Sequence, residues 1–409
     1  MDLVIRRARI LQEDTLRTVD IGLQGAVIAA IQPALDTEAP ELEAEGRLVV
    51  PGLIETHIHL DKTCILDRCS LQEGTLAEAV RETSAAKKTF TVEDVYARAQ
   101  RTLERCIAHG AMHMRTHVEV DPVIGMIGFQ AIEQLARDYS WAVDVEVCVF
   151  PQEGLINNPG TEGLLMEGLR RGARTIGAAP YCDSDSRGQI DRIFSIARDF
   201  DAEIDMHLDL GDTTEGMQIE YVCRKTEEFR WGGRVAVGHA TQMSLLPPAR
   251  VGAIASRLAD AGVAVTILPA TDLYLMGRTH DHGEPRGVVS AEPLRKAGVT
   301  CSISTNNVLN PFTPYGDGSL IRMANLYANV CRVSRPVDLA GCLDMITGAA
   351  ARLMRLGDYG IAVGAPADLV ALNATSPADA VATLAQPLWG IKRGRLSFNW
   401  PLPHLRPPG

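Results

Sequence analysis

The pattern of apolar and polar residues divides the chain into a long middle region between two shorter ends. Eight short apolar runs recur through the middle, and stretches with helical periodicity separate most of them. The runs lie near residues 52–59, 111–120, 142–150, 174–180, 203–210, 234–240, 263–270 and 299–305. Strand and helix alternating eight times is typical of a (β/α)₈ barrel. We therefore predict an α/β protein whose residues 51–360 form a TIM barrel.

The segment between the first two runs shows the helical pattern most fully. Thr91 can cap a helix, Glu93 and Asp94 place acidic groups in its first turn, and Gly110 can end it. The pattern therefore predicts a helix between Thr91 and Gly110.

The two ends of the chain share a different pattern. Short runs of β-branched and aliphatic residues alternate there with turns that contain glycine and proline. Because chain termini commonly lie close together, the two ends can pair. We predict that residues 1–50 and 361–409 form one small composite β-sandwich domain.

Length, charge and cysteine content narrow the class of protein. The 409 residues suit one large barrel with a small extra domain, and the net charge of −11 argues against nucleic acid or an anionic membrane as partner. No apolar run reaches the roughly 18 residues of a membrane helix, and the N-terminus lacks a signal-like apolar region. The nine scattered cysteines fit a reducing compartment. We predict a cytoplasmic protein that binds a small molecule, with a homo-oligomer as an open alternative.

Histidines gather where a barrel enzyme carries its active site. Five of the ten histidines fall at the carboxyl ends of predicted strands, namely His57, His59, His117, His207 and His239. Residues two apart on a strand point to the same side, so His57 and His59 can hold one ion together. An isolated pair of this kind is as often two packed histidines, but His207 and His239 on other strands favour a metal. Imidazole suits zinc, iron and similar metals, so we predict one divalent ion.

Residues 51–63, which read PGLIETHIHLDKT, resemble the opening signature of the amidohydrolase superfamily. Later segments resemble bacterial cytosine deaminases, and the first and last segments are also similar to N-isopropylammelide isopropylaminohydrolases. These later segments read MRTHVEVDP, VFPQEGLIN, IDMHLDL, GHATQM, LMGRTHDHGEPRG and NNVLNPFTPYGDGSL. The resemblance extends from near residue 48 to near residue 375 and implies the same barrel with a β-sandwich.

The resemblance also implies roles for individual residues. His57, His59 and His207 match three metal ligands, and Asn306 stands where the family has an aspartate as the fourth. His239 matches a catalytic histidine that activates water. The resemblance further places Gln152 at the substrate and Asp61 just behind the metal ligands.

Two departures from the cytosine deaminase pattern change the expected chemistry. Asn306 can offer a carbonyl oxygen to a metal but cannot accept a proton as the aspartate does. Leu210 stands where the family has a proton-shuttling glutamate. Asp209 is the nearest carboxylate and a catalytic candidate, although strand alternation would send it to the other side. Because deamination of cytosine needs both an acid and a base, we expect a substrate other than cytosine.

Several further residues lie near the predicted mouth of the barrel. Lys62, Arg115, His117, Asn307 and Phe312 are candidates for substrate binding. Surface exposure or ion pairing is the alternative for the two cations. A tight turn is the alternative for the Asn306–Asn307 pair, since asparagine tolerates left-handed backbone angles.

Taken together, these patterns predict a metal-dependent amidohydrolase. It would act on a C–N bond of a small nitrogen heterocycle, by deamination or by hydrolysis of a cyclic amide or amine. The alternative is a protein of the same fold that has lost hydrolysis and serves as a ligand-binding protein, a lyase or an isomerase, because fold does not determine reaction.

Overall fold

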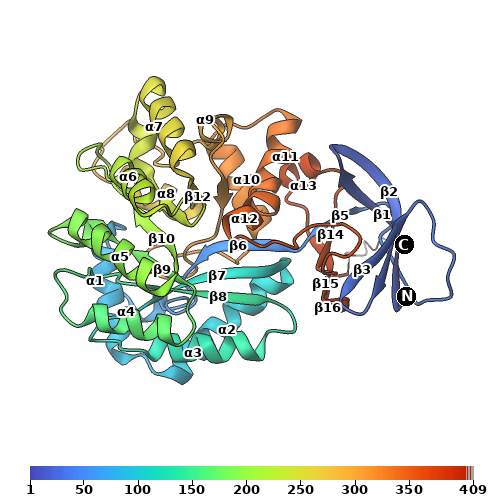
Figure 1. Ribbon diagram of the computed structural model, residues 1–409, viewed down its shortest axis with the longest axis horizontal. Coiled ribbons are helices and arrows are strands. Elements are labelled where there is room, and N and C mark those ends of the chain that lie inside the picture. The colour runs from blue at the N-terminus through green and yellow to red at the C-terminus, as the bar shows by residue number, and fades with distance from the viewer. Residues whose placement is uncertain (402, 404–405, 407–409) are drawn as a thin grey trace.

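The computed structural model describes residues 1–401, 403 and 406; His404 and the other tail residues lie outside the described residues. It has two parts: a barrel ringed by helices, and a small sheet that contains both ends of the described chain (Figure 1). The blue N-terminal strands and the red C-terminal strands lie side by side in this sheet.

Eight parallel strands form the barrel, each hydrogen-bonded to the next in chain order from β6 to β13. They are β6 Leu53–Ile58, β7 Ala111–Glu119, β8 Asp144–Phe150, β9 Thr175–Ala178, β10 Glu203–Leu208, β11 Val235–His239, β12 Val263–Ile267 and β13 Cys301–Ile303. Every strand coincides with a predicted apolar run, so the predicted fold is confirmed.

The last strand meets the first just beyond the end of β13. Asn306 donates its backbone N–H to the His57 carbonyl at 2.9 Å, and its own carbonyl accepts the His59 N–H at 2.9 Å. These two backbone hydrogen bonds close the barrel at its carboxyl end, next to the predicted metal ligands.

Helices surround the barrel and fill the connections between strands. The predicted helix is α2, in which the Thr91 side chain accepts the Asp94 N–H at its beginning. The helices are α1 Leu76–Ala86, α2 Val92–Ala108, α3 Ile127–Asp138, α4 Thr161–Arg170, α5 Ser186–Phe200, α6 Ile219–Phe229, α7 Pro248–Ala261, α8 Pro269–Leu275, α9 Ala291–Lys296, α10 Leu320–Val330, α11 Pro336–Asp344, α12 Gly348–Leu353 and α13 Pro377–Ala382. Among the described residues, no helix is both long and apolar enough to cross a membrane.

The small domain is one continuous eight-stranded sheet curved around its own apolar core. Its strands are β1 Leu3–Gln12, β2 Thr15–Gln24, β3 Val27–Gln32, β4 Glu41–Glu43, β5 Leu48–Pro51, β14 Leu369–Leu372, β15 Pro387–Lys392 and β16 Arg395–Asn399. Strand β5 pairs antiparallel with β14 and so joins the two ends of the chain, as predicted. Domain boundaries at residues 51 and 360 stay a prediction.

Charged residues connect the small sheet to the amino-terminal end of the barrel strands. Lys392, the last residue of β15, is buried and donates to Asp144 at 2.8 Å and to Asp368 at 2.6 Å. His113, near the start of β7, lies 3.3 Å from the Asp368 carboxylate. We refer to Lys392, Asp144, Asp368 and His113 as the base cluster.

Candidate metal and active site

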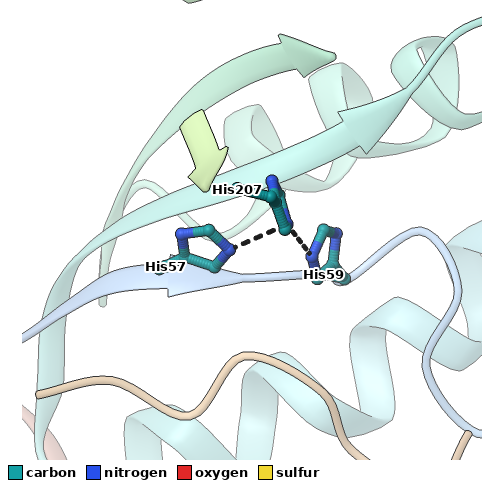
Figure 2. Close-up of side chains that lie close together, drawn as sticks. All are labelled: His57, His59 and His207. Carbon is teal, nitrogen blue, oxygen red and sulfur yellow. Dashed lines mark hydrogen bonds between the residues drawn. The ribbon is translucent and has the colours of Figure 1, made fainter. Parts of the chain in front are cut away.

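Three histidines converge at the carboxyl end of the barrel strands. His57 on β6 and His59 just after it point toward His207 on β10 (Figure 2). The Nε2 atom of His207 lies 3.1 Å from Nε2 of His57 and 3.0 Å from Nε2 of His59. All three side chains are buried. The spacing predicted from the sequence therefore brings three ring nitrogens to one point.

The geometry and charge state of this triad fit a metal ion. Three nitrogens bound to zinc at about 2.0–2.1 Å in a tetrahedral arrangement lie just over 3 Å apart, close to the distances seen here. Burial, with a smaller effect from His117, lowers the pKa of His57 to about 3. Burial likewise holds the pKa of His59 and of His207 well below the usual value. The rings are therefore neutral, which is the state that binds metals.

Asn306, which the resemblance implies as a fourth ligand, follows the last barrel strand. Its backbone has a left-handed φ of 63°, the conformation that asparagine tolerates best after glycine. The side chain is buried, and neither its Oδ1 nor its Nδ2 atom has a hydrogen-bond partner. Because a buried amide without partners is costly, this side chain is suited to meet a group that the protein itself does not supply.

A second layer lies beneath the triad. The His117 ring stacks on the His57 ring with centroids 3.7 Å apart, and its Nε2 atom is 3.6 Å from Asp205 Oδ1. Burial alone would raise the pKa of Asp205, but His117, His57 and Arg115 hold it well below its ordinary value. Arg115 donates to Asp205 at 3.0 Å and to Glu146 at 2.7 Å. Its guanidinium is thus engaged within the barrel, the ion-paired alternative foreseen for it.

His239, the last residue of β11, is held by a carboxylate that sequence reasoning missed. Its Nδ1 atom lies 2.6 Å from Oδ1 of Asp272, which belongs to the short helix α8. Burial raises the pKa of Asp272, and His239 opposes that rise. The His239 ring centroid is 5.5 Å from that of His207. An ionised Asp272 would direct the Nδ1 proton toward itself and leave Nε2 free to exchange protons.

Lys62 and Gln152 form a polar pair beside the triad. Lys62 is only 2% exposed, and its Nζ donates to Gln152 Oε1 at 2.5 Å. The ammonium lies 5.0 Å from the centroid of the Phe150 ring and 4.9 Å from that of Phe312. The other face of this contact involves His207, because the Phe150 ring also stacks on the His207 ring with centroids 4.9 Å apart. The lysine is therefore one aromatic ring away from the metal ligands.

Other predicted residues have mainly local partners. Asp61 accepts the backbone N–H of Glu119 at 2.9 Å, while its Oδ1 atom is buried without a partner. Asn307 accepts from Asn310 Nδ2 at 2.7 Å and so shapes the loop after β13. These contacts place both residues next to the site and show how the protein holds them.

The end of β10 differs from the simple alternation expected there. The strand ends at Leu208, and Asp209 has a left-handed φ of 50°, so the alternation of a strand no longer sets the direction of its side chain. Its two carboxylate oxygens accept the backbone N–H groups of Gln218 and Ile219 at 2.8 and 3.0 Å, at the beginning of α6. Burial raises the pKa of Asp209 to about 6. The carboxylate is thus occupied by the helix.

Leu210, where the resemblance implies a glutamate, belongs to an apolar cluster. Its partners include Phe312 and residues of α1 and α8. Leu210 itself therefore offers no proton donor or acceptor at this position.

Two missed residues carry a signal in the sequence. Glu55 and Asp205 each precede a metal-ligand candidate by two residues, on the same side of the strand. The buried Glu55 carboxylate accepts the Thr305 backbone N–H at 3.0 Å and so secures the seam between first and last strands. Burial raises the pKa of Glu55 to about 7. Asp272 carries no such signal, because its partner His239 lies on another element.

The barrel, the strand-end histidines and the surrounding carboxylates define the class of protein. The amidohydrolase family matches residues 41–134 and 129–397, and the chain belongs to this family. Its members are hydrolases that act on carbon–nitrogen bonds, so the predicted enzyme class is confirmed.

Particular relatives match over nearly the whole chain. N-isopropylammelide isopropyl amidohydrolase of Pseudomonas sp. strain ADP is 27% identical over 97% of this chain and 96% of its own. Pterin deaminase of Rhizobium rhizogenes strain K84 is 26% identical over 88% of this chain and 83% of its own. The crystal structure of 5-methylcytosine deaminase from Klebsiella pneumoniae, liganded with 5-fluorocytosine, superimposes with a TM-score of 0.93 at 27% identity, covering 98% of this chain and 99% of that chain. The predicted resemblance is therefore confirmed.

Proposed function

We propose that this protein is a metal-dependent hydrolase that cleaves a C–N bond of a small nitrogen heterocycle other than cytosine. The observation that carries the proposal is the convergence of three buried, neutral imidazoles on one point. The relatives support the substrate class, since their names include a pterin deaminase, a 5-methylcytosine deaminase and an ammelide hydrolase. A cytoplasmic location and a homo-oligomeric state stay predictions.

His57, His59 and His207 would hold one divalent ion, zinc or iron, with the Asn306 carbonyl oxygen as a fourth donor. An ion in such a site lowers the pKa of water to about 7, which supplies a nucleophile at neutral pH. Because all four protein donors are neutral, the protein itself would cancel none of the ion's charge.

His239 would carry the proton transfers that Asn306 and Leu210 cannot perform. With Nδ1 held by Asp272, its Nε2 atom can accept a proton from the attacking water and return it to the leaving nitrogen. The same dyad would stabilise the imidazolium that forms between the two transfers. Asp209 is left out of this scheme because both its oxygens bind the beginning of α6.

Lys62, Gln152, Asn307 and Phe312 would surround the substrate. Gln152 and Lys62 offer hydrogen-bond donors, while the Phe312 ring and the apolar wall at Leu210 offer a flat, dry surface. His117 and Arg115 would act from below by orienting His57 through stacking and through Asp205.

The replacement of two acid/base residues by Asn306 and Leu210 also favours a second candidate, a relative that has lost hydrolysis. It would bind its ligand, or act as a lyase or isomerase. Product analysis in ¹⁸O-labelled water separates these functions, since only hydrolysis places a solvent oxygen in the product.

The direct test measures metal content and turnover together. Wild type, His207→Ala and the exposed control His280→Ala would be purified, reconstituted with Zn²⁺ or Fe²⁺, and analysed by elemental analysis. We expect about one ion per chain in wild type and the control, and little in His207→Ala. Release of ammonia or amine from a panel of pyrimidines, pterins and triazines should follow the same order. Stoichiometric metal without turnover of any panel member would contradict the proposal.

A further inference from the structure

Lys62 is a buried lysine whose ammonium has no carboxylate in direct contact, although the Glu119 and Asp61 carboxylates act on it from farther away. Among the described residues, no carboxylate lies within 4 Å of its Nζ, and its one hydrogen bond goes to the neutral Gln152. The rings of Phe150 and Phe312 flank the ammonium and keep water away from it. Because a buried charge without a directly bonded partner of opposite charge is costly, this position is suited to a ligand that brings a negative charge.

The other buried lysines show how this protein treats a buried ammonium when no ligand is involved. Lys87 contacts three carboxylates, those of Glu119, Asp121 and Glu153. Lys392 contacts two, those of Asp144 and Asp368. Of the three buried lysines in the described part of the chain, Lys62 alone lacks a carboxylate and Lys62 alone lies beside the histidine triad.

The polar atoms around Lys62 are oriented to donate. Because an ammonium only donates, Gln152 must turn its Oε1 atom toward Lys62, which leaves Nε2 to face elsewhere. That Nε2 atom is buried without a hydrogen-bond partner, with the Tyr181 side chain near the same amide. The pair therefore presents a free amide N–H beside an ammonium, which suits an anionic oxygen and its neighbouring acceptor.

The neutral donor set strengthens the same preference. Where a carboxylate ligand would reduce the charge of a bound cation, Asn306 supplies an uncharged amide. A ring that carries a negative charge would thus meet two positive charges, those of the bound cation and of the Lys62 ammonium, in one buried site, and Coulomb attraction is strong where water is excluded.

From these contacts we infer that the substrate is an anionic heterocycle, one that presents an enolate-like or carboxylate oxygen to Lys62 and Gln152. The inference that this ligand is the substrate rests on the proposed function, whereas the binding preference does not depend on catalysis. Neutral rings of the same size would bind weakly, because they leave the Lys62 ammonium buried and unpaired.

The test compares two six-membered rings on metal-loaded protein. Barbiturate is an anion at neutral pH, and uracil has a similar ring without the charge. Their dissociation constants would be measured by equilibrium dialysis for wild type, Lys62→Met and the exposed control Lys88→Met. If a probe is turned over, kcat/KM replaces the dissociation constant in the same comparison.

We expect wild type and Lys88→Met to bind barbiturate about thirtyfold or more tightly than uracil, and Lys62→Met to lose most of that preference. Equal binding of the two rings by wild type, or of neither, would overturn the inference without any variant. Equal weakening of both rings in Lys62→Met would overturn it as well. A Lys62-dependent preference for barbiturate without turnover of any heterocycle would support the inference and contradict the proposed hydrolysis. Turnover of neutral rings that does not depend on Lys62 would support the proposed hydrolysis and overturn the inference.

Discussion

The two ends of the barrel strands treat buried polar groups in opposite ways. At the amino-terminal end, the base cluster pairs Lys392 with two carboxylates, and none of its side chains has a buried atom without a partner. At the carboxyl end, the triad, Asn306, His117 and Gln152 all have such atoms. All but two of the buried, unpartnered side-chain atoms in the described chain belong to this end and its supporting residues. At the amino-terminal end the protein itself supplies partners for the buried polar groups, whereas at the carboxyl end those groups are left for ligands.

The largest effect is expected for the His239–Asp272 pair at the carboxyl end of the strands. Asp272→Asn keeps the shape but removes the charge that sets the tautomer of His239, so kcat should fall by about 10²–10⁴. Metal content and the thermal midpoint should change little. A kcat within a factor of three of wild type would remove His239–Asp272 from the proton-transfer scheme.

The next largest effect is expected on stability, at the amino-terminal end of the strands. Lys392→Met leaves the buried Asp368 without its ammonium, whereas the partly exposed Asp144 keeps its contact with Arg393, so the cost should be about 3 kcal/mol of unfolding free energy. Urea denaturation measures this directly. Turnover per folded molecule should stay at the wild-type value, because the base cluster lies at the opposite end of the strands.

Lys62→Met should change stability in the opposite direction. Removing an unpaired buried charge should raise the unfolding free energy of the metal-loaded protein by about 1 kcal/mol while activity falls. If Lys62→Met and Lys392→Met destabilised the protein equally, the contrast between the two ends would be lost.

Acid should weaken the base cluster in a defined pH range. Burial alone would raise the pKa of Asp368, but His113, Lys392 and the Arg393 backbone hold it well below the usual value. A depressed pKa stabilises the folded state above the unfolded pKa, and this contribution is lost as pH falls through the folded pKa. Asp368→Asn should therefore cost about 2 kcal/mol at neutral pH, and the difference from wild type should shrink below about pH 4. Urea titrations across pH 3 to 7 measure it; a constant difference would contradict the assignment.

The smallest effect is an expected increase in metal affinity. Asn306→Asp supplies an anionic oxygen in place of an amide, so metal affinity should rise by about tenfold. Competition with a chelator measures the affinity, and an unchanged value would mean that residue 306 is not a ligand.

The sequence predicts the repeating parts of the fold better than the contacts between distant elements. Period-two alternation placed His57 and His59 on one side, and strand ends placed His207 beside them. The pairing of His239 with Asp272 joins two elements whose relative position only the folded barrel defines. Asp209 departs from alternation because the strand ends one residue before it, and strand ends are the least regular part of such patterns. The sequence pattern predicts Arg115 near the mouth, whereas its carboxylate partners hold it within the barrel.

Asn306 closes the barrel through its backbone, while its buried side chain has no hydrogen-bond partner in the protein. The seam between β6 and the chain after β13 uses only the N–H and C=O groups that every residue except proline carries in full. A change between side chains that tolerate the left-handed backbone, such as asparagine and aspartate, therefore alters the chemistry of the centre while the barrel stays closed. New reactivity at such a position does not require a new barrel.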